Sequence, residues 1–455
     1  MTLLPRRTLL IAGLGLTVVA LLAAAVVSAS VVATEGDAGS SPTTVAPIAT
    51  TTTTAAVVAS TSTSPAPPGV VAALEEIWRA TPGGCLRVTA GISVIYDANG
   101  SREVAPASVT KVFTAAAALE VLGPDARLET TVETMSPAVD GVVRGDIWLV
   151  GGGDPVLGTD AWAAQLADDR RLYTSLDTLA DRVVAAGLRR IEGRVLGDES
   201  RYDSARYVDT WPARLVDDGE AGPLSALTVN DGFRIWGHPG VPFVNPPADA
   251  AALFRELLIA RGITVVGGGD AGERPQDAER IASAASPTVR ELVHAMLSDS
   301  DNGTAELLVK EIGWRSRRVG STAAGSAAIE ELLGRLKIPT AGVVVADGSG
   351  LSTAARLTCN AMTAFLDRMA DDLPHLLAVG GRDGTLATRF RGSPAEGRIR
   401  AKTGSLNGMA ALAGYADTAA GRVVFAYVAT DLPNGTSNRQ LQDALAVVLV
   451  TTQWQ

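Results

Sequence analysis

The chain has 455 residues, of which 47% are hydrophobic and 19% are charged, and its formal net charge is −10. This length and composition indicate a globular protein larger than one ordinary domain. The acidic balance argues against nucleic acid as a partner, because a phosphate backbone calls for a basic surface. The three histidines and two cysteines form no HxxxH or CxxC pair, so we expect neither a metal site nor another cofactor.

Residues 1–33 are typical of a targeting segment. Arg6 and Arg7 precede an uncharged stretch, 8–33, that is dominated by Leu, Ala and Val. As a helix this stretch would be about 39 Å long, enough for a hydrocarbon core about 30 Å thick. The arginines predict that the N-terminus is cytoplasmic and that the remaining chain lies outside. We therefore expect an uncleaved anchor in the cell membrane. The alternative is a signal peptide cleaved near residues 28–30, which would release a secreted protein.

Residues 34–68 are crowded with Thr, Ser, Ala and Pro. Such a composition cannot bury a core, so this segment is predicted to be a disordered linker. Export would permit a disulfide bond, and we hypothesise one between Cys85 and Cys359.

Folded structure is predicted to begin near Gly69. The pattern over 70–80 indicates an amphipathic helix, and 92–96 and 102–104 resemble two short strands separated by turn residues. An alanine-rich helix is predicted over 113–122, ending at a glycine.

Ser108 and Lys111 lie three residues apart where this helix opens. On a helix, that spacing places both side chains on one face. A serine hydroxyl is a poor nucleophile and needs an adjacent base. A lysine that is removed from water can act as one, because desolvation lowers its pKa. The pair therefore predicts a nucleophile and its base, although S-x-x-K alone is a weak signal.

Ser300-Asp301-Asn302 lies between two predicted helices, 289–297 and 305–312. A serine and an asparagine two positions apart suit a turn whose side chains face a cleft. The alternative interpretation is an ordinary helix N-cap.

Lys402-Thr403-Gly404-Ser405 opens a predicted strand, followed by strands over 409–415 and 423–430. The lysine and the hydroxyls could bind a substrate carboxylate, and the glycine would let a substrate backbone approach closely. The alternative is a strand entrance with a glycine kink.

S-x-x-K, S-x-N and K-T-G in this order are the signature of penicillin-binding proteins and class A β-lactamases. Two of the four lysines of the chain fall inside these motifs. The stretch between Ser108 and Ser300 is far longer than the compact β-lactamases have there, so it predicts an inserted module. Within it we expect helices over 176–186 and 250–260 and strands over 145–150, 194–197 and 263–266.

The chain from about Gly69 onward resembles the D-Ala-D-Ala carboxypeptidase/endopeptidase family typified by penicillin-binding protein 4. The resemblance implies an α+β fold: a transpeptidase/β-lactamase-like domain, 69–128 and 287–455, with an antiparallel sheet flanked by helices, split by one or two small α/β domains over 129–286. The stretches that carry the resemblance are Pro106-Ala107-Ser108, Gly151-Gly152-Gly153-Asp154-Pro155, Gly197-Asp198, Pro223-Leu224-Ser225-Ala226-Leu227, Ser300-Asp301-Asn302, Asp347-Gly348-Ser349-Gly350-Leu351-Ser352 and Gly381-Arg382-Asp383-Gly384-Thr385-Leu386.

The resemblance also implies a serine D-Ala-D-Ala carboxypeptidase that hydrolyses peptidoglycan stem peptides through an acyl-enzyme and is inhibited by β-lactams. Ser108 would attack the peptide carbonyl, and Lys111 would accept its proton. Ser300 would pass a proton to the departing amine, while Asn302 would bind the substrate amide and orient the lysine. Carboxypeptidase and endopeptidase activities share this acyl-enzyme, so both remain open.

Further substrate contacts follow from the same resemblance. Lys402 and Thr403 would hold the terminal carboxylate, next to Gly404, and the backbone N–H of Ser405 would complete an oxyanion hole with that of Ser108. Asp154 would bind a side-chain amine of the stem peptide.

The chain departs from the family pattern at one position. Relatives that act on diaminopimelate-type stems often carry an arginine directly after G-L-S. Here that position is Thr353, with Arg356 three residues further on.

Two other functions are compatible with the motifs. A β-lactamase of class A would need a glutamate that activates water, and no E-x-x-x-N stretch is present. A tethered wall-binding protein on an inactive enzyme fold would need no turnover at all.

Overall fold

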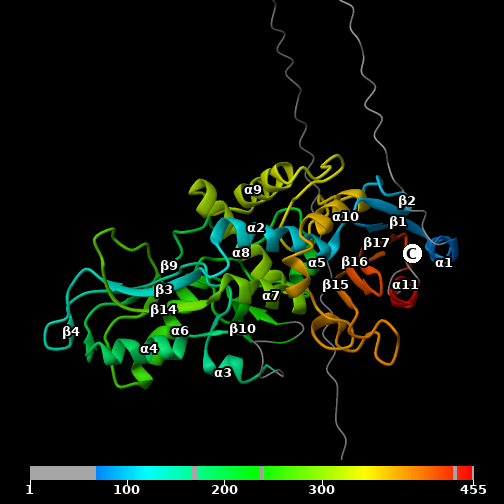
Figure 1. Cartoon of the computed structure of the whole chain (residues 1–455). Helices are drawn as coiled ribbons and strands as arrows, with labels where there is room; N and C mark the ends of the chain where they lie inside the picture. Colours follow the sequence, from blue (N-terminus) through cyan, green and yellow to red (C-terminus); the bar gives the residue numbers. More distant parts are fainter. Residues whose placement is uncertain (1–67, 167–171, 236, 238–239, 434–437, 453–455) are drawn as a thin grey trace, which may run out of the picture. The chain divides into compact units, whose positions relative to one another are not determined.

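The computed structural model of the chain describes residues 68–455, except 167–171, 236, 238–239, 434–437 and 453–455 (Figure 1). The predicted membrane segment and the predicted linker up to residue 67 lie outside the described residues. Pro68, which we placed in the linker, instead begins the first helix, because proline suits the first turn of a helix. No helix in the described part is long and apolar enough to cross a membrane.

The main sheet has five antiparallel strands and is buried on both faces. Successive side chains of its central strand point to opposite sides: Val424 and Ala426 join one core, and Phe425 and Tyr427 join the other. This alternation follows from the two-residue period of a strand. In spatial order the strands are β15 (Ile399–Leu406), β16 (Met409–Thr418), β17 (Gly421–Thr430), β1 (Gly83–Ala90) and β2 (Ser93–Ala98).

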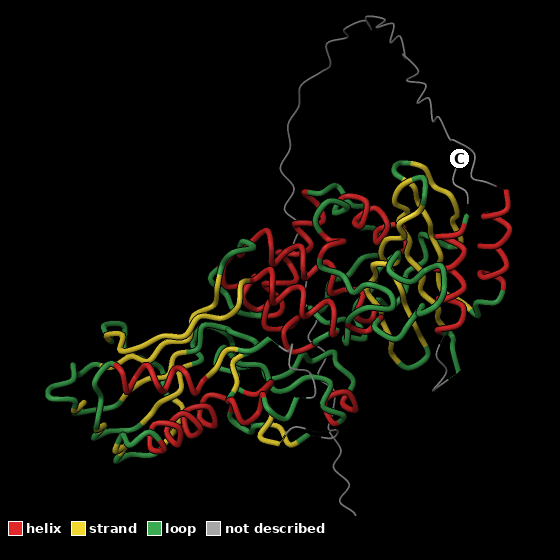
Figure 2. The backbone as a smooth tube through the Cα atoms, turned by 60° about the horizontal axis from the view of Figure 1, so that its bottom comes forward, coloured by secondary structure: helices red, strands yellow, loops and turns green. Residues whose placement is uncertain are grey.

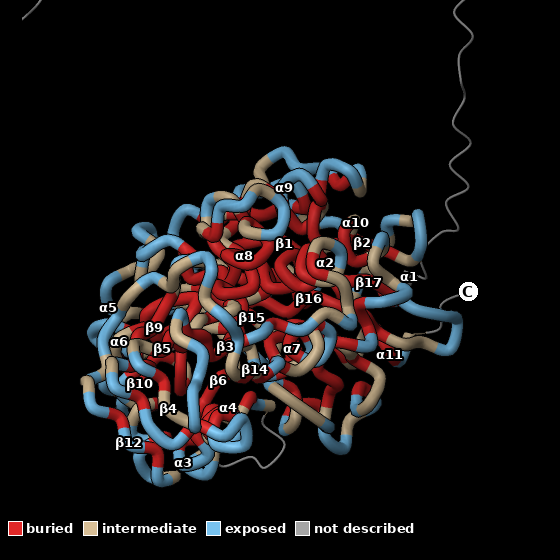
Figure 3. The backbone as a smooth tube through the Cα atoms, turned by 90° about the vertical axis from the view of Figure 1, so that its left-hand side faces the viewer, coloured by how far each residue is buried: buried red, intermediate tan, exposed pale blue. Residues whose placement is uncertain are grey.

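Helices cover both faces of this sheet. On one face lie α1 (Pro68–Arg79) and α11 (Arg439–Thr451), visible in Figure 2 as two coils beside the strands. On the other face a larger group of helices shares one core, and the alanine-rich α2 (Lys111–Leu122) is fully buried in it from Lys111 to Ala118. The other helices of this group are α7 (Val289–Asp299), α8 (Asn302–Arg317), α9 (Thr322–Arg335) and α10 (Cys359–Arg368). Figure 3 shows how much of this backbone is buried.

Between α2 and α7 the chain forms a second sheet with its own core. The chain leaves along β3 (Arg127–Thr134) and returns along β14 (Glu279–Thr288), and these two strands pair antiparallel. The other strands of this mixed sheet are β5 (Ile147–Val150), β9 (Val195–Asp198) and β13 (Gly269–Ala271), in the spatial order β13-β9-β5-β3-β14. Its core includes side chains of α4 (Leu176–Ala185) and α6 (Pro246–Ala260).

Short elements complete this part of the chain. They are the strands β4 (Val142–Val143), β6 (Leu157–Gly158), β7 (Thr174–Ser175), β8 (Arg190–Ile191), β10 (Phe233–Ile235), β11 (Val241–Pro242) and β12 (Thr264–Val265), and the helices α3 (Asp160–Ala163) and α5 (Ala213–Asp217).

The predicted α+β class is confirmed, but one predicted strand is wrong. In the segment 102–104, only Val104 forms a bridge, with Leu357. A turn closed by the N–H of Arg102 on the carbonyl of Asn99 precedes it, and this turn keeps the segment out of the sheet.

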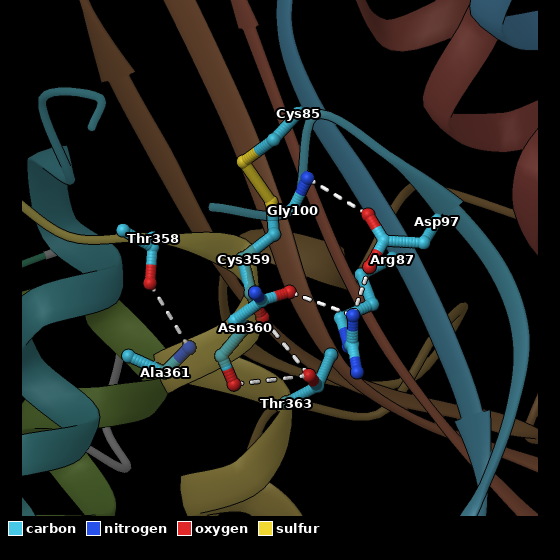
Figure 4. The surroundings of a disulfide bond; sticks show 9 residues. All are labelled: Cys85, Arg87, Asp97, Gly100, Thr358, Cys359, Asn360, Ala361 and Thr363. Atoms are coloured by element: carbon cyan, nitrogen blue, oxygen red, sulfur yellow. Dashed lines mark hydrogen bonds and ion pairs between the residues drawn. A yellow bond between two sulfur atoms is a disulfide. The ribbon is translucent and has the colours of Figure 1, made fainter. Parts of the chain in front are cut away.

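The hypothesised disulfide bond is confirmed. Cys85 of β1 and Cys359 at the start of α10 are bonded, with their Cα atoms 6.0 Å apart. Around the bond, the guanidinium of Arg87 pairs with Asp97 and donates to the side-chain oxygen of Asn360 at 2.7 Å (Figure 4). The N-terminal strand is thus tied to a helix far along the sequence.

Candidate active site

Ser108 lies in a single 3-10 turn, η1 (Ala107–Thr110), that runs directly into α2. Gly350 packs closely against this turn, because a Cβ on Gly350 would lie 1.9 Å from the carbonyl oxygen of Ala107. Ala107 itself has φ of +47°, a conformation that costs energy for alanine. The strained turn holds the serine at the start of the helix, and Lys111 follows one turn later.

Lys111 is buried and makes three contacts. Its Nζ lies 2.9 Å from Ser108 Oγ, 2.7 Å from Asn302 Oδ1 and 2.8 Å from the carbonyl oxygen of Ser349. Burial lowers the pKa of Lys111 to about 8, because desolvation outweighs the nearby negative charges that favour the protonated form. About a tenth of this amine is therefore neutral at pH 7.

The Ser300-Asp301-Asn302 turn joins α7 to α8. Ser300 ends α7 in the left-handed conformation, and Asp301 caps α8 by accepting from the N–H of Thr304. The helix-cap interpretation thus holds for the aspartate, while the serine and asparagine line the cavity beside Ser108. The Asn302 amide is oriented by its Nδ2, which donates to the carbonyl oxygen of Glu220 at 2.7 Å.

The K-T-G motif lies on β15. Lys402 is buried, and its Nζ donates to the carbonyl oxygen of Thr403 at 3.0 Å. Burial, and then the charge of Lys111, hold the pKa of Lys402 well below its usual range. A Cβ on Gly404 would lie 3.2 Å from Pro106 O and from Ala107 Cβ, so this glycine allows the serine-bearing turn to pack on the strand.

These motifs meet in a cavity of about 590 Å³. Ser108, Ser300, Asn302, Thr403 and Ser405 all line it. The structure therefore brings residues of all three motifs together at one place.

Other lining residues were not assigned to the site from the sequence. Thr385 accepts a hydrogen bond at its Oγ1 from Thr403 Oγ1 at 3.0 Å. It lies in the G-R-D-G-T-L stretch that carries the family resemblance, so the sequence could have marked it as a site residue. Arg214 and Glu220 come from the inserted part of the chain, and no local pattern marks them. Arg214 is half-exposed, and its ion pair with Asp218 is 3.6 Å long.

Asp154 does not line this cavity. It is buried, its Oδ1 accepts from the N–H of Val156 at 3.0 Å, and its Oδ2 has no hydrogen-bond partner among the described residues. Burial raises the pKa of Asp154 to about 6. Thr353 donates its hydroxyl to the Thr210 carbonyl, and Arg356 donates to two backbone carbonyls of its own loop.

A second cavity of about 450 Å³ adjoins the first, since Asp299 lines both. Its wall includes Trp162, Ala295 on α7, and Gly384, which is the neighbour of Thr385.

A partly buried serine in contact with a buried lysine, in a cavity with residues of two further motifs, is an arrangement typical of a serine hydrolase. The model of the D-Ala-D-Ala carboxypeptidase 3 (S13) family matches residues 70–236 and 240–452. The chain belongs to this family. It is a hydrolase, a serine-type D-Ala-D-Ala carboxypeptidase that acts on peptidoglycan.

Relatives agree with this assignment, and a solved structure has the same fold. The chain is 32% identical to a D-alanyl-D-alanine carboxypeptidase of Actinomadura sp., over 78% of each protein. It is 33% identical to the carboxypeptidase DacB of Mycolicibacterium smegmatis, over 76% of this chain and 75% of that protein. Its fold is similar to that of penicillin-binding protein 4 from Haemophilus influenzae, with a TM-score of 0.71 and 21% identity over 82% of this chain and 97% of that one.

Proposed function

We propose that Ser108 is the nucleophile and Lys111 the general base of this carboxypeptidase. The contacts of Lys111 Nζ carry the proposal. Two of its three neighbours, the Asn302 Oδ1 and Ser349 carbonyl oxygens, can only accept hydrogen bonds. They take both N–H groups of a neutral amine, whose lone pair then faces the hydroxyl of Ser108.

Each step follows from that arrangement. Ser108 Oγ attacks the carbonyl carbon of the D-Ala–D-Ala bond, and its proton passes to Lys111 Nζ. The C–N bond then breaks: Ser300 hands its proton to the departing amine of D-alanine and takes in return the proton that Lys111 holds, so that both groups regain their starting forms. The N–H groups of Ser108 and Ser405 stabilise the oxyanion, a contact worth about 3 kcal/mol per donor. Water hydrolyses the ester and frees the serine.

The terminal carboxylate of the substrate would bind at the β15 end of the cavity. The hydroxyls of Thr403 and Thr385 line this part of the cavity. A bound carboxylate would favour the protonated form of the neighbouring Lys402, because an opposite charge raises the pKa of an amine. β-Lactams present the same carboxylate and an acylating carbonyl, so they should acylate Ser108.

The test combines a fluorescent penicillin with the natural reaction. The full-length protein in detergent is labelled and its adduct is located by mass spectrometry, while D-alanine release is measured with a stem pentapeptide. An adduct on Ser108 together with release supports the proposal. The absence of both would contradict it and favour a wall-binding protein on an inactive fold. Rapid release of the hydrolysed antibiotic would instead indicate a β-lactamase.

Cleavage of D,D-cross-links is a second candidate activity, favoured by the second cavity. The leaving group of the carboxypeptidase reaction is a single alanine, whereas that of the endopeptidase reaction is a whole peptide. The second cavity adjoins the carboxylate end of the first through Gly384 and Asp299, so it offers room for a peptide there.

Filling the second cavity separates the two activities. Ala295→Phe should slow cleavage of a cross-linked dimer at least about tenfold, while D-alanine release stays within about twofold. Ala323→Phe, at an exposed position of α9, is the control. Equal loss of both activities in Ala295→Phe would contradict a separate peptide site.

The enzyme is further proposed to be anchored in the cell membrane by residues 1–33, with its catalytic part outside the cytoplasm. The disulfide bond supports an oxidising compartment. Membrane fractionation and mass spectrometry of the mature N-terminus test this location. An intact N-terminus in the membrane fraction supports the anchor, and a new N-terminus near residues 28–30 would show cleavage instead.

A further inference from the structure

Glu306 is a buried carboxyl group that the catalytic steps above do not use. It lies one helical turn after Asn302 on α8 and is 0% exposed. Its Oε1 accepts from the backbone N–H groups of Gly348, at 3.0 Å, and Ser349, at 2.7 Å. Its Oε2 is buried and has no hydrogen-bond partner within the described part of the chain.

The two peptide groups that Glu306 holds also contact the catalytic helix. The carbonyl of Ser349 accepts from Lys111 Nζ at 2.8 Å, and the carbonyl of Gly348 accepts from Thr114 Oγ1 at 2.8 Å. A Cβ on Gly348 would lie 2.6 Å from the carbonyl oxygen of Ala305, so this segment is pressed against α8. The position of the Ser349 carbonyl, and with it the Lys111 amine, therefore depends on Glu306.

The surroundings of Glu306 favour its neutral form. An unpaired buried oxygen is far more costly on a carboxylate than on a neutral acid. Its acidic neighbour is better satisfied, because Asp347 accepts from the N–H groups of Gly350 and Ser352 and from Trp211 Nε1. Burial, and then the charge of Asp347, raise the pKa of Glu306, and they outweigh the side chain of Ser349 and the two backbone N–H groups, which favour ionisation.

The charge state of Glu306 matters to the amine beside it. Several elements contribute charges that act on Lys111. Of the negative charges that would hold the lysine protonated, that of Glu306 has the largest effect. The other charged groups are Asp347, Asp301, Glu220 and, with the opposite sign, Lys402.

We propose that Glu306 is a positioning residue for Lys111 that acts as a neutral carboxylic acid. Its Oε1 holds the Ser349 peptide group, whose carbonyl accepts a hydrogen bond from Lys111. Because the acid is protonated, it places no negative charge beside that amine. The proposal rests on the role of Lys111 as the base.

Two substitutions test the two halves of this role through the pH profile of penicillin acylation. Glu306→Gln keeps the size and the neutral charge, so the rate should stay within about threefold and the acidic limb should move by less than about 0.3 pH unit. Glu306→Ala removes the acceptor for both N–H groups, and the rate should fall more than about tenfold. A downward shift of about one unit or more in Glu306→Gln would mean that the native group is ionised, and would overturn the proposal. Full activity in Glu306→Ala would overturn the positioning role.

Glu311→Gln is the matched control, since Glu311 is also buried on α8 but pairs with Arg201 and Tyr202. It should lower the melting temperature without moving the pH profile. Infrared difference spectra of wild type against Glu306→Gln should contain a protonated-carboxyl band at neutral pH, and its absence would overturn the proposal without reference to activity. If the wild-type protein is not acylated at all, the proposal that Lys111 is the base is contradicted. The infrared band still decides the charge state of Glu306 in that case.

Discussion

The two walls of the active cavity hold their polar groups in different ways. On the wall built from η1, α2 and α8, Lys111 is fully buried and has three fixed neighbours. On the wall built from the inserted part, the side chain of Arg214 is 46% exposed and has one long ion pair, with the residue that caps its own helix. Groups that are held in a fixed, water-free site can stabilise a transition state strongly. Exposed charged groups contribute little free energy to an interaction, because water screens them. We therefore expect substitutions on the first wall to change the rate of acylation and those on the second to change substrate affinity.

The largest effect is expected at the nucleophile. Ser108→Ala should abolish covalent labelling by penicillin while leaving the melting temperature nearly unchanged, because only one hydroxyl is lost. Mass spectrometry of the labelled protein checks this, with the exposed Ser101→Ala as control. A stable adduct on another serine would remove Ser108 from its role.

Lys111→Arg should be nearly as damaging. Arginine keeps the charge but cannot give up its proton at ordinary pH, so acylation should slow by roughly 10³-fold. Stopped-flow measurement with a chromogenic β-lactam gives the rate, and Lys337→Arg at an exposed site is the control. Near-normal acylation would show that another group is the base.

The pH dependence should be smaller but clear. Because burial lowers the pKa of Lys111 to about 8, the neutral fraction, and with it the rate, should rise about fiftyfold between pH 6 and pH 8. A flat profile over this range, or an inflection close to the ordinary lysine value of about 10.4, would contradict the burial argument.

Arg214→Ala tests the exposed wall. Loss of a half-exposed cation should raise KM for an acidic stem peptide roughly three- to tenfold and leave kcat nearly unchanged. Asp218→Ala, which frees Arg214 from its ion pair, should not raise KM. A fall in kcat at constant KM in Arg214→Ala would contradict the expectation that the exposed wall affects substrate affinity and not the rate.

The smallest effect on activity is expected from the disulfide bond, because neither cysteine lines the cavity. The double variant Cys85→Ser, Cys359→Ser should lose about 2–5 kcal/mol in free energy of unfolding and retain its rate at 25 °C within about twofold. Thermal unfolding under oxidising conditions measures the loss. An unchanged melting temperature would contradict a stabilising role.

The sequence predicts those parts that local patterns encode. The helix over 289–297 is marked by a capping box at Thr288 and Glu291, and the three motifs are marked by their spacing. The strands β3 and β14 were not predicted, because β14 is rich in Ser and Ala and both strands owe their structure to pairing between distant segments.

The same division applies to the site. Ser108 and Lys111 are predicted by their spacing of three residues, whereas other groups of the site come from distant parts of the chain. Only the tertiary structure brings the carbonyl of Ser349 to Lys111 and places Glu220 and Arg214 in the cavity wall. Backbone carbonyls carry no sequence signal, and a lone arginine in a short exposed helix resembles any other.

The strand order of the main sheet has a consequence for biosynthesis. β1, which comes first among its strands, lies between β2 and β17, and Gly83 pairs with Thr430 near the other end of the chain. The serine-bearing turn packs against β15, which is also made late. A growing chain therefore carries Ser108 for most of its synthesis without the wall that the serine needs. The enzyme should be unable to react with penicillin until β15 to β17 have emerged, and a chain truncated before residue 399 should remain unlabelled.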